Sequence, residues 1–193
     1  MENRTGWIKD CIDASRRAVD SLERQIDKVA AAADMIVETF RRGNKVLSAG
    51  NGGSAAEAMH LAEEAVGRFR GNRVSLPAIA LCADGTALTC IGNDFGFDRV
   101  FSRQVEGLGA PGDLLVLFTS SGNSANLEFA LEAAKARGMR TLAILGKTGG
   151  RLAGRADLEI IIEGTDSGRI QEAHQLLMHI LLDAVERAFP ANA

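Results

Sequence analysis

Short apolar runs alternate with helical patterns along most of the chain. From Asn44 onward, five apolar runs of strand length lack any polar–apolar alternation, which is typical of strands covered on both faces of a parallel sheet. They lie at 45–49, 77–82, 114–119, 141–145 and 158–162. Helical spacing predicts helices at about 54–69, 85–92, 98–108, 124–137, 150–155 and 168–188. The sequence therefore predicts an α/β fold with a doubly wound, five-stranded parallel sheet flanked by helices.

The chain begins with a helical pattern that precedes any strand. Apolar residues recur at helical spacing over 8–29, and the basic turn and glycine at 41–43 are a helix stop. Asp34 interrupts the apolar pattern, so we expect one long helix or two with a break near that residue. We predict that 1–43 is an N-terminal helical segment for packing or oligomerisation, and that 44–193 is the main body of a single domain.

Composition restricts the class of protein. The chain has 193 residues, 46% hydrophobic and 24% charged, which suits one folded domain and excludes a disordered or collagen-like chain. The net charge of −3 argues against a nucleic-acid partner. Three cysteines without a Cys-X-X-Cys pair favour a reduced, cytoplasmic compartment over a disulfide framework. The first ten residues lack the apolar core of a secretory signal, and no apolar run is long enough for a membrane helix.

A glycine-rich loop follows the first predicted strand. Residues 49–54 read Ala-Gly-Asn-Gly-Gly-Ser, and these glycines let the backbone approach a ligand closely. Ser54 and Glu57 have the spacing of a capping box at the start of a helix. The helix N-terminus would then favour an anion at this loop, although a plain strand-to-helix turn is the simpler alternative.

A second polar loop follows the third predicted strand. Residues 119–124 read Thr-Ser-Ser-Gly-Asn-Ser, so hydroxyl groups and helix-terminal amides lie together. Such groups suit the oxygens of a phosphate. A polar turn in which Ser124 caps the next helix is the alternative, but the hydroxyls are denser than a cap requires.

Neither loop is a nucleotide-binding P-loop. Gly146-Lys147-Thr148 would need a glycine at position 141, which is Thr. Gly50, Gly52 and Ala55 satisfy the loose dinucleotide pattern, but the acidic residue expected about 20 positions later is missing at 70–73. A dinucleotide-dependent oxidoreductase is therefore a weak alternative.

Three histidines occur, and two of them have partners at helical spacing. His60 and Glu64 are four residues apart and share a helix face, which suits two ligands of one metal or an acid–base pair. From that helix alone, a solvated polar face opposite the apolar stripe is the better explanation. Gln171 and His179 lie two turns apart on the last helix and are able to reach one ligand, with His174 pointing elsewhere.

Taken together, these motifs resemble the phosphoheptose isomerases of the sugar-isomerase (SIS) superfamily. The matching segments are 50–54, 58–64, 67–69, 91–97, 100–106, 120–126 and 169–174, in one order and without large gaps over about 6–188. The resemblance implies the SIS fold. It also implies an aldose–ketose isomerase that converts sedoheptulose 7-phosphate to D-glycero-D-manno-heptose 7-phosphate through an enediol, toward the ADP-heptose of bacterial lipopolysaccharide and other surface polysaccharides.

The resemblance also implies a cytoplasmic homotetramer with zinc and with active sites between subunits. Glu64 would be the catalytic base and His179 the acid. The implied metal ligands are His60, Glu64, Gln171 and His179. The implied substrate-binding residues are Asn51, Gly52, Gly53, Glu64, Arg68, Asn93, Asp94, Thr119, Ser120, Ser121, Ser124 and Gln171. These residue types suit the reaction, which needs a base, an acid and a group that polarises the enediol oxygens.

A non-catalytic SIS-domain regulator, which binds a partner protein or senses a sugar phosphate, is the alternative. Glu64 and His179 are both present, and this favours the enzyme. The sequence departs from common family members at Gly168, where some have an acidic residue, and over 82–87. These departures affect the expected sugar preference rather than the catalytic groups.

Overall fold

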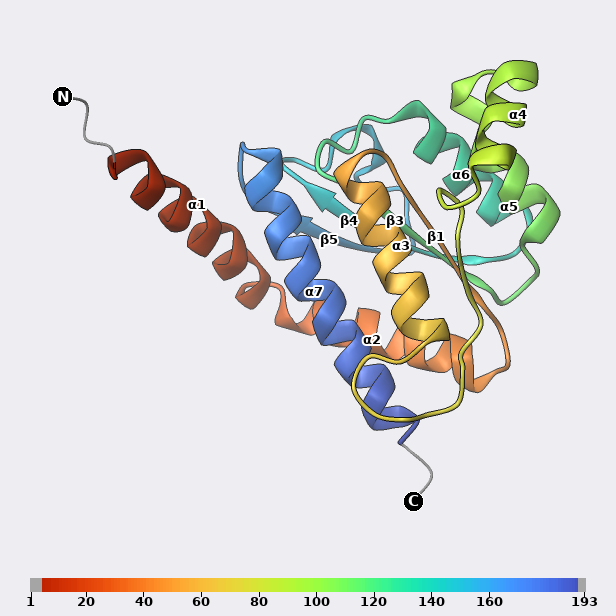
Figure 1. The fold of residues 1–193 in the computed structure, drawn as a ribbon, viewed down its shortest axis with the longest axis horizontal. Helices are drawn as coiled ribbons and strands as arrows, with labels where there is room; N and C mark the ends of the chain where they lie inside the picture. Colours follow the sequence, from red (N-terminus) through yellow and green to blue (C-terminus); the bar gives the residue numbers. More distant parts are fainter. Residues whose placement is uncertain (1–4, 191–193) are drawn as a thin grey trace.

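Five parallel strands form one sheet in the order β2-β1-β3-β4-β5 in the computed structural model, which describes residues 5–190 (Figure 1). The strands are β1 (Val46–Gly50), β2 (Ala78–Ala80), β3 (Leu114–Thr119), β4 (Arg140–Gly146) and β5 (Leu158–Ile162). The predicted architecture is confirmed, and β3 and β5 have the predicted bounds. Strand β2 is shorter than predicted because it lies at the sheet edge, where it pairs with β1 alone. Residues 1–4 and 191–193, the outer ends of the predicted segments, lie outside the described residues.

Helices cover both faces of this sheet. They are α1 (Gly6–Glu23), α2 (Ile26–Arg41), α3 (Gly53–Val66), α4 (Gly85–Phe95), α5 (Ser102–Leu108), α6 (Ala125–Ala136) and α7 (Ser167–Ala188), with 3₁₀ turns η1 (Phe97–Arg99) and η2 (Gly150–Leu152). One core lies between the sheet and α2, α3 and α7, together with the second half of α1. The other core lies between the sheet and α5 and α6. The predicted helix at 150–155 is thus only a 3₁₀ turn, and the one at 98–108 is divided into η1 and α5.

The N-terminal segment consists of two helices, and the break lies at Arg24-Gln25 rather than near Asp34. Asp34 is on the exposed side of α2 and disturbs no packing. Gln25 leaves helical geometry, and its side-chain amide bonds both backbone groups of Ile161: Nε2 donates to the carbonyl oxygen at 2.8 Å, and Oε1 accepts from N–H at 3.2 Å. The helix is therefore interrupted at the residue whose side chain forms hydrogen bonds with the unpaired edge of β5.

The two N-terminal helices differ in how far they are packed. Helix α2 and the second half of α1 contact α7 and β5 and contribute to the core. The first half of α1 extends away from the sheet, and its Trp7, Ile8 and Ile12 are exposed (Figure 1). In residues 5–190, no helix is both long and apolar enough to cross a membrane.

The strand order places the two predicted anion loops next to each other. Gly50, at the end of β1, pairs with Phe118, next to the end of β3. Strand β2, which follows β1 in the chain, lies next to β1 toward one edge of the sheet, and β3 lies next to β1 toward the other edge. Ligands bind at such a change of direction, outside the carboxyl ends of the strands. The loops after β1 and β3 and the loop after β4 all lie at this edge.

Candidate active site

A cluster of polar side chains joins α3 to α7. Nε2 of His60 lies 3.1 Å from Oε1 of Glu64, and Nδ1 of His60 lies 2.5 Å from Nε2 of Gln175. The same Gln175 nitrogen lies 3.2 Å from Nε2 of His179. The rings of His60 and His179 meet edge to face with centroids 5.3 Å apart, and Phe69 stacks on His179 at 5.4 Å. Three of the four predicted metal ligands therefore come together within one chain.

The contacts of this cluster link its members through shared polar atoms. The Gln175 amide nitrogen lies within hydrogen-bond distance of one ring nitrogen of each histidine. The other ring nitrogen of His60 lies within hydrogen-bond distance of Glu64. Gln175 and His60 thus hold the two histidines and Glu64 in one arrangement.

Glu64 is more enclosed than its neighbour on the same helix. Its side chain is 16% exposed, against 67% for Glu63 and 32% for His60. The helix end that carries Glu64 is held by buried Arg73, which donates to the carbonyl oxygens of Glu64 and Ala65. The polar face of α3 thus packs against α7 and is not the solvated face that the helix alone suggests.

A group of possible metal-binding atoms lies on α3. Ligand atoms of His60, Glu63 and Glu64 all lie within 4.8 Å of one another. One histidine nitrogen with carboxylate oxygens is a donor set that zinc accepts in catalytic sites. The 3.1 Å between His60 and Glu64 is also close to the spacing of two ligands on one ion. The residues present therefore fit a metal of this class.

A shallow depression runs from the start of α3 to the polar cluster. Its volume is about 590 Å³. Its lining residues are Gly53, Ala56, Glu57, His60, Gly168, Gln171, Glu172 and Gln175. Gln171, the fourth predicted metal ligand, lies at the Gly53 end, where a Cβ on that glycine would come within 2.4 Å of the Gln171 amide nitrogen. The chain therefore brings Gln171 to the same depression as His60, but one helical turn nearer the loop.

The loop after β1 is built differently from the prediction. Helix α3 begins at Gly53, its N-cap is Gly52 with a φ of 57°, and no side chain caps it. The predicted capping box of Ser54 and Glu57 is wrong, because both residues lie inside the helix. Glu57 instead points at His174 of α7, with 3.4 Å between Oε2 and Nδ1.

The two predicted anion loops are joined by side-chain amides. Asn51 donates to Oδ1 of Asn126, and Asn126 donates to Oδ1 of Asn51, each at 2.9 Å. Asn126 lies in the first turn of α6, directly after the loop at 119–124. The sequence analysis nominated Asn51 but not its partner.

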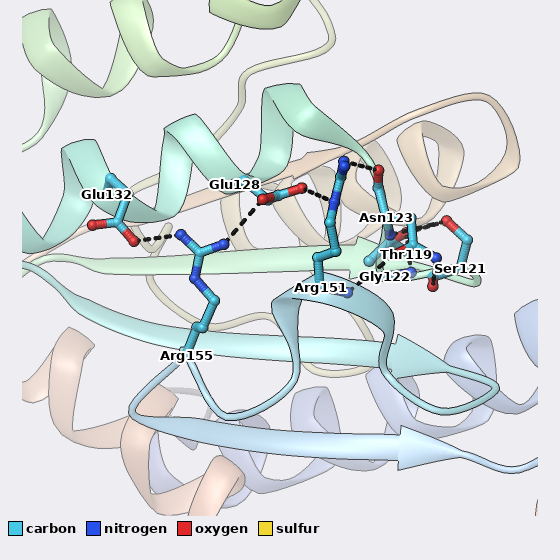
Figure 2. Close-up of polar contacts among 8 residues, drawn as sticks. All are labelled: Thr119, Ser121, Gly122, Asn123, Glu128, Glu132, Arg151 and Arg155. Atoms are coloured by element: carbon cyan, nitrogen blue, oxygen red, sulfur yellow. Dashed lines mark hydrogen bonds and ion pairs between the residues drawn. The ribbon is translucent and has the colours of Figure 1, made fainter.

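Hydroxyls fix the backbone of the loop after β3. Oγ1 of Thr119 accepts from the N–H of Gly122 at 3.1 Å, and Oγ of Ser121 accepts from the N–H of Asn123 at 3.2 Å (Figure 2). Ser124 is the N-cap of α6 by backbone geometry, without a side-chain hydrogen bond. The two hydroxyls also lie 3.5 Å apart, so one of them donates to the other and one hydroxyl proton is left for a ligand. The loop therefore combines hydroxyl donors with the N-terminus of a 12-residue helix.

Three nominated residues lie apart from both groups. Asn93 and Asp94 are exposed on α4, where Nδ2 of Asn93 donates to Oδ1 of Asp94 at 2.8 Å. Arg68 is exposed just beyond the end of α3. Across residues 5–190, no hydrogen bond or ion pair links any of the three to the His60 cluster or to the loops. Helix α4 has no buried residue and projects from the body of the molecule (Figure 1).

Sequence reasoning missed two parts of the site. Gln175 bridges both histidines, and the signal was its spacing of four residues from Gln171 and from His179. The pair of Glu57 and His174 joins α3 to α7 in the core; Nε2 of His174 also lies 3.2 Å from the carbonyl oxygen of Leu145. His174 is fully buried, so its part is to hold α7 against α3 and β4 rather than to contact a ligand.

Cys82 lies near the start of α3 without the properties of a nucleophile. Burial raises the pKa of its thiol, and the thiol donates to the carbonyl oxygen of Ala55 at 3.3 Å. A protonated, hydrogen-bonded thiol is poorly reactive. The chemistry at this edge of the sheet therefore rests on the carboxylate, imidazole and hydroxyl groups.

Comparison with known proteins agrees with this geometry. Residues 11–146 match the model of the SIS domain family. A phosphoheptose isomerase of Geobacter sp. (strain M21) is 52% identical over 181 residues, which covers 93% of this chain and 94% of that protein. The solved phosphoheptose isomerase of Francisella tularensis superposes with a TM-score of 0.91 at 32% identity, over 97% of this chain and all of that one. That of Neisseria gonorrhoeae gives 0.86 at 38% identity, over 96% and 98%.

The fold is that of an SIS domain. The chain belongs to the SIS domain family and, within it, to the phosphoheptose isomerases.

Proposed function

We propose that the chain is an aldose–ketose isomerase that converts sedoheptulose 7-phosphate to D-glycero-D-manno-heptose 7-phosphate. The 52% identity to a phosphoheptose isomerase, over almost the whole of both chains, carries this proposal. It is supported by the convergence of Glu64, His60 and His179 beside two anion-favouring loops. The regulator alternative is not favoured, because the groups needed for proton transfer are present and enclosed.

We propose that proton transfer takes place at the His60 cluster, one end of the depression, and that the phosphate binds near its other end. Isomerisation removes a proton from the carbon next to a carbonyl and returns it to the neighbouring carbon, through an enediol. Glu64 is the proposed base, since it is enclosed, ionisable and oriented by His60. His179 is the proposed acid for the substrate oxygens, oriented by Gln175 and Phe69.

The phosphate would bind at the loops after β1 and β3. Asn51, Gly52 and Gly53 are proposed to line it on one side, and Thr119, Ser120, Ser121 and Ser124 on the other. From Gly53 to His60 the helix rises about 10 Å, which is close to the length of an extended seven-carbon sugar phosphate. Binding energy at the phosphate would then position the far carbons against Glu64.

Zinc is the proposed metal, held by His60, Glu64, Gln171 and His179. A bound zinc would polarise the oxygens of the sugar as a Lewis acid. Elemental analysis tests the ligand set without reference to activity. Wild type is expected to retain zinc after dialysis and His60→Ala to lose it, while Glu63→Gln keeps it. Equal metal content in wild type and His60→Ala would contradict the assignment.

We further propose a cytoplasmic homotetramer whose active sites lie between subunits. The exposed α4 would then bring Asn93 and Asp94 to the substrate of a neighbouring subunit, and the exposed half of α1 would serve as the N-terminal oligomerisation segment. Arg68, exposed just beyond the end of α3, would act across the same boundary. Light scattering is expected to give four times the mass of one chain; a monomer that is fully active would contradict the shared site.

The proposed pathway for the product is the supply of ADP-heptose for lipopolysaccharide.

The activity itself is tested with purified protein and sedoheptulose 7-phosphate in heavy water. Formation of the aldose with solvent deuterium at the carbon that gains the proton, observed by NMR, is the expected result. Binding of the sugar phosphate without turnover, with or without added zinc, would favour the regulator and contradict the enzyme.

A further inference from the structure

Arg151 holds the loop at 119–124 from outside. It comes from η2, after β4, and lies on the other side of Asn123 from Ser121 (Figure 2). Its backbone N–H donates to Oδ1 of Asn123 at 3.0 Å, and Nη2 of its guanidinium donates to the carbonyl oxygen of Asn123 at 2.7 Å. One residue thus fixes both the side chain and the backbone of the residue before the helix cap.

The backbones of the two loops are in direct contact. The N–H of Leu152 donates to the carbonyl oxygen of Gly122 at 3.1 Å. A Cβ on Gly122 would come within 1.9 Å of the carbonyl oxygen of Gly149, and one on Gly150 within 2.5 Å of that of Ser121. Both glycines have positive φ. The loop after β4 therefore sets the shape of the loop after β3.

Arg151 also forms an ion pair with an acidic residue beside this loop. Its Nε lies 2.7 Å from Oε1 of Glu128, in the first turn of α6. This carboxylate oxygen is buried and has no hydrogen-bond partner among the described residues, so the ion pair with Arg151 is the contact that balances its charge. Arg155 binds the second oxygen of Glu128 at 3.0 Å and also Glu132 at 2.7 Å (Figure 2). Without these cations, a negative charge would stand beside the site of an anion.

We propose that Arg151 is a positioning residue for phosphate binding. It holds Asn123 so that the hydroxyl and N–H groups of 119–124 keep their geometry, and it neutralises Glu128 close to the phosphate. The inference rests on the proposed function of this loop as the phosphate site. Arg151 acts through Asn123 and Glu128, so its effect falls on affinity for the phosphate and not on proton transfer at Glu64.

Arg155 offers a matched control. It binds the same glutamate as Arg151, but its side-chain contacts run to Glu128 and Glu132 and not to the loop. Arg151→Met, Arg151→Lys and Arg155→Met are compared with wild type. The readouts are kcat and KM for sedoheptulose 7-phosphate, the inhibition constant of inorganic phosphate, and thermal unfolding.

Arg151→Met is expected to raise both KM and the phosphate inhibition constant about tenfold with little change in kcat, since the hydrogen bond from the guanidinium to the carbonyl oxygen of Asn123 and the ion pair with Glu128 are lost. Arg151→Lys is expected to recover part of the affinity because it keeps a charge near Glu128, and Arg155→Met to weaken phosphate binding much less than Arg151→Met does, because Arg151 still pairs with Glu128 and its contacts with Asn123 remain. Unchanged phosphate inhibition in Arg151→Met, or an equal loss in Arg155→Met, would overturn the proposal.

A different set of results would show that the loop at 119–124 does not bind the phosphate. In that case inorganic phosphate would not inhibit wild type, or Ser121→Ala would be inhibited as strongly as wild type, and the proposed phosphate site would fall together with the role of Arg151. Inhibited wild type with a weakened Ser121→Ala and an unaltered Arg151→Met would overturn the role of Arg151 alone.

Discussion

Asn51 and Asn126 exchange two hydrogen bonds of 2.9 Å through their side-chain amides. Asn51 is the first residue of the glycine-rich turn after β1, and Asn126 lies in the first turn of α6 after the serine-rich loop. The pair therefore fixes the spacing of the two loops that are proposed to hold the phosphate, although 75 positions separate them in the chain.

Removal of this pair is expected to weaken phosphate binding. Asn126→Ala should raise KM roughly tenfold, because two amide bonds and the loop spacing are lost. Asn126→Asp should bind phosphate more weakly still, since it adds a negative charge beside the anion. Calorimetry with inorganic phosphate measures both; an Asn126→Asp variant that binds phosphate as tightly as Asn126→Ala would show that no anion binds near this residue.

A substitution at Gly53 tests whether activity depends on the position of the Gln171 side chain. Alanine at position 53 would place Cβ 2.4 Å from the Gln171 amide nitrogen, so this flexible side chain must move while the helix backbone remains intact. We expect Gly53→Ala to lose most of its activity with a near-normal melting temperature. Gly85→Ala is the control, because Gly85 is also the first residue of a helix and a Cβ there meets nothing within 4 Å. Full activity in Gly53→Ala would contradict a role for Gln171.

Glu57 and His174 are expected to contribute stability. Both side chains are buried, with 3.4 Å between Oε2 and Nδ1. Glu57→Ala leaves His174 without this partner and should lower the free energy of unfolding by about 1 kcal/mol. Exposed Glu63 on the same helix is the control, and Glu63→Ala should change stability by less than about 0.5 kcal/mol. Urea denaturation measures both, and equal effects would contradict the assignment.

Asp113 should make stability depend on pH. Burial acts to raise the pKa of this carboxyl, but hydrogen bonds from Lys45 Nζ at 2.5 Å and from the backbone N–H groups of Lys45 and Ala110 outweigh it and hold the pKa below its usual value. A lowered pKa adds stability above the unfolded value of 3.8, and this stability is lost as pH falls through the folded value.

The matching variant is Asp113→Asn. It should unfold about 2 kcal/mol more easily than wild type at pH 7. The difference should shrink as the pH falls below 4, where wild type also loses the charge. Asp13, whose pKa is lowered by exposed Lys9, is the control, and Asp13→Asn should differ little at either pH. A constant difference across this range for Asp113→Asn would contradict the charge as the cause.

The sequence predicts the fold well because its strands are buried on both faces and so appear as unbroken apolar runs. It also predicts both loops, since their glycines and hydroxyls are local signals. The capping box failed because Glu57 forms a tertiary contact with His174, 117 positions away, in place of a local one. Arg151 was missed for the same reason, because it acts on residues of another element. Gln175 has a local signal in its spacing from His179, but its contact with His60 of α3 is tertiary.

The central claim is that Glu64 moves the proton, and Glu64→Gln beside Glu63→Gln tests it most directly. Both variants keep the size of the side chain, and both residues lie near His60, but only Glu64 is enclosed and hydrogen-bonded to it. With sedoheptulose 7-phosphate, Glu64→Gln is expected to lose about a hundredfold or more in kcat while it still binds inorganic phosphate, and Glu63→Gln to remain close to wild type. Near-normal turnover in Glu64→Gln would contradict the account.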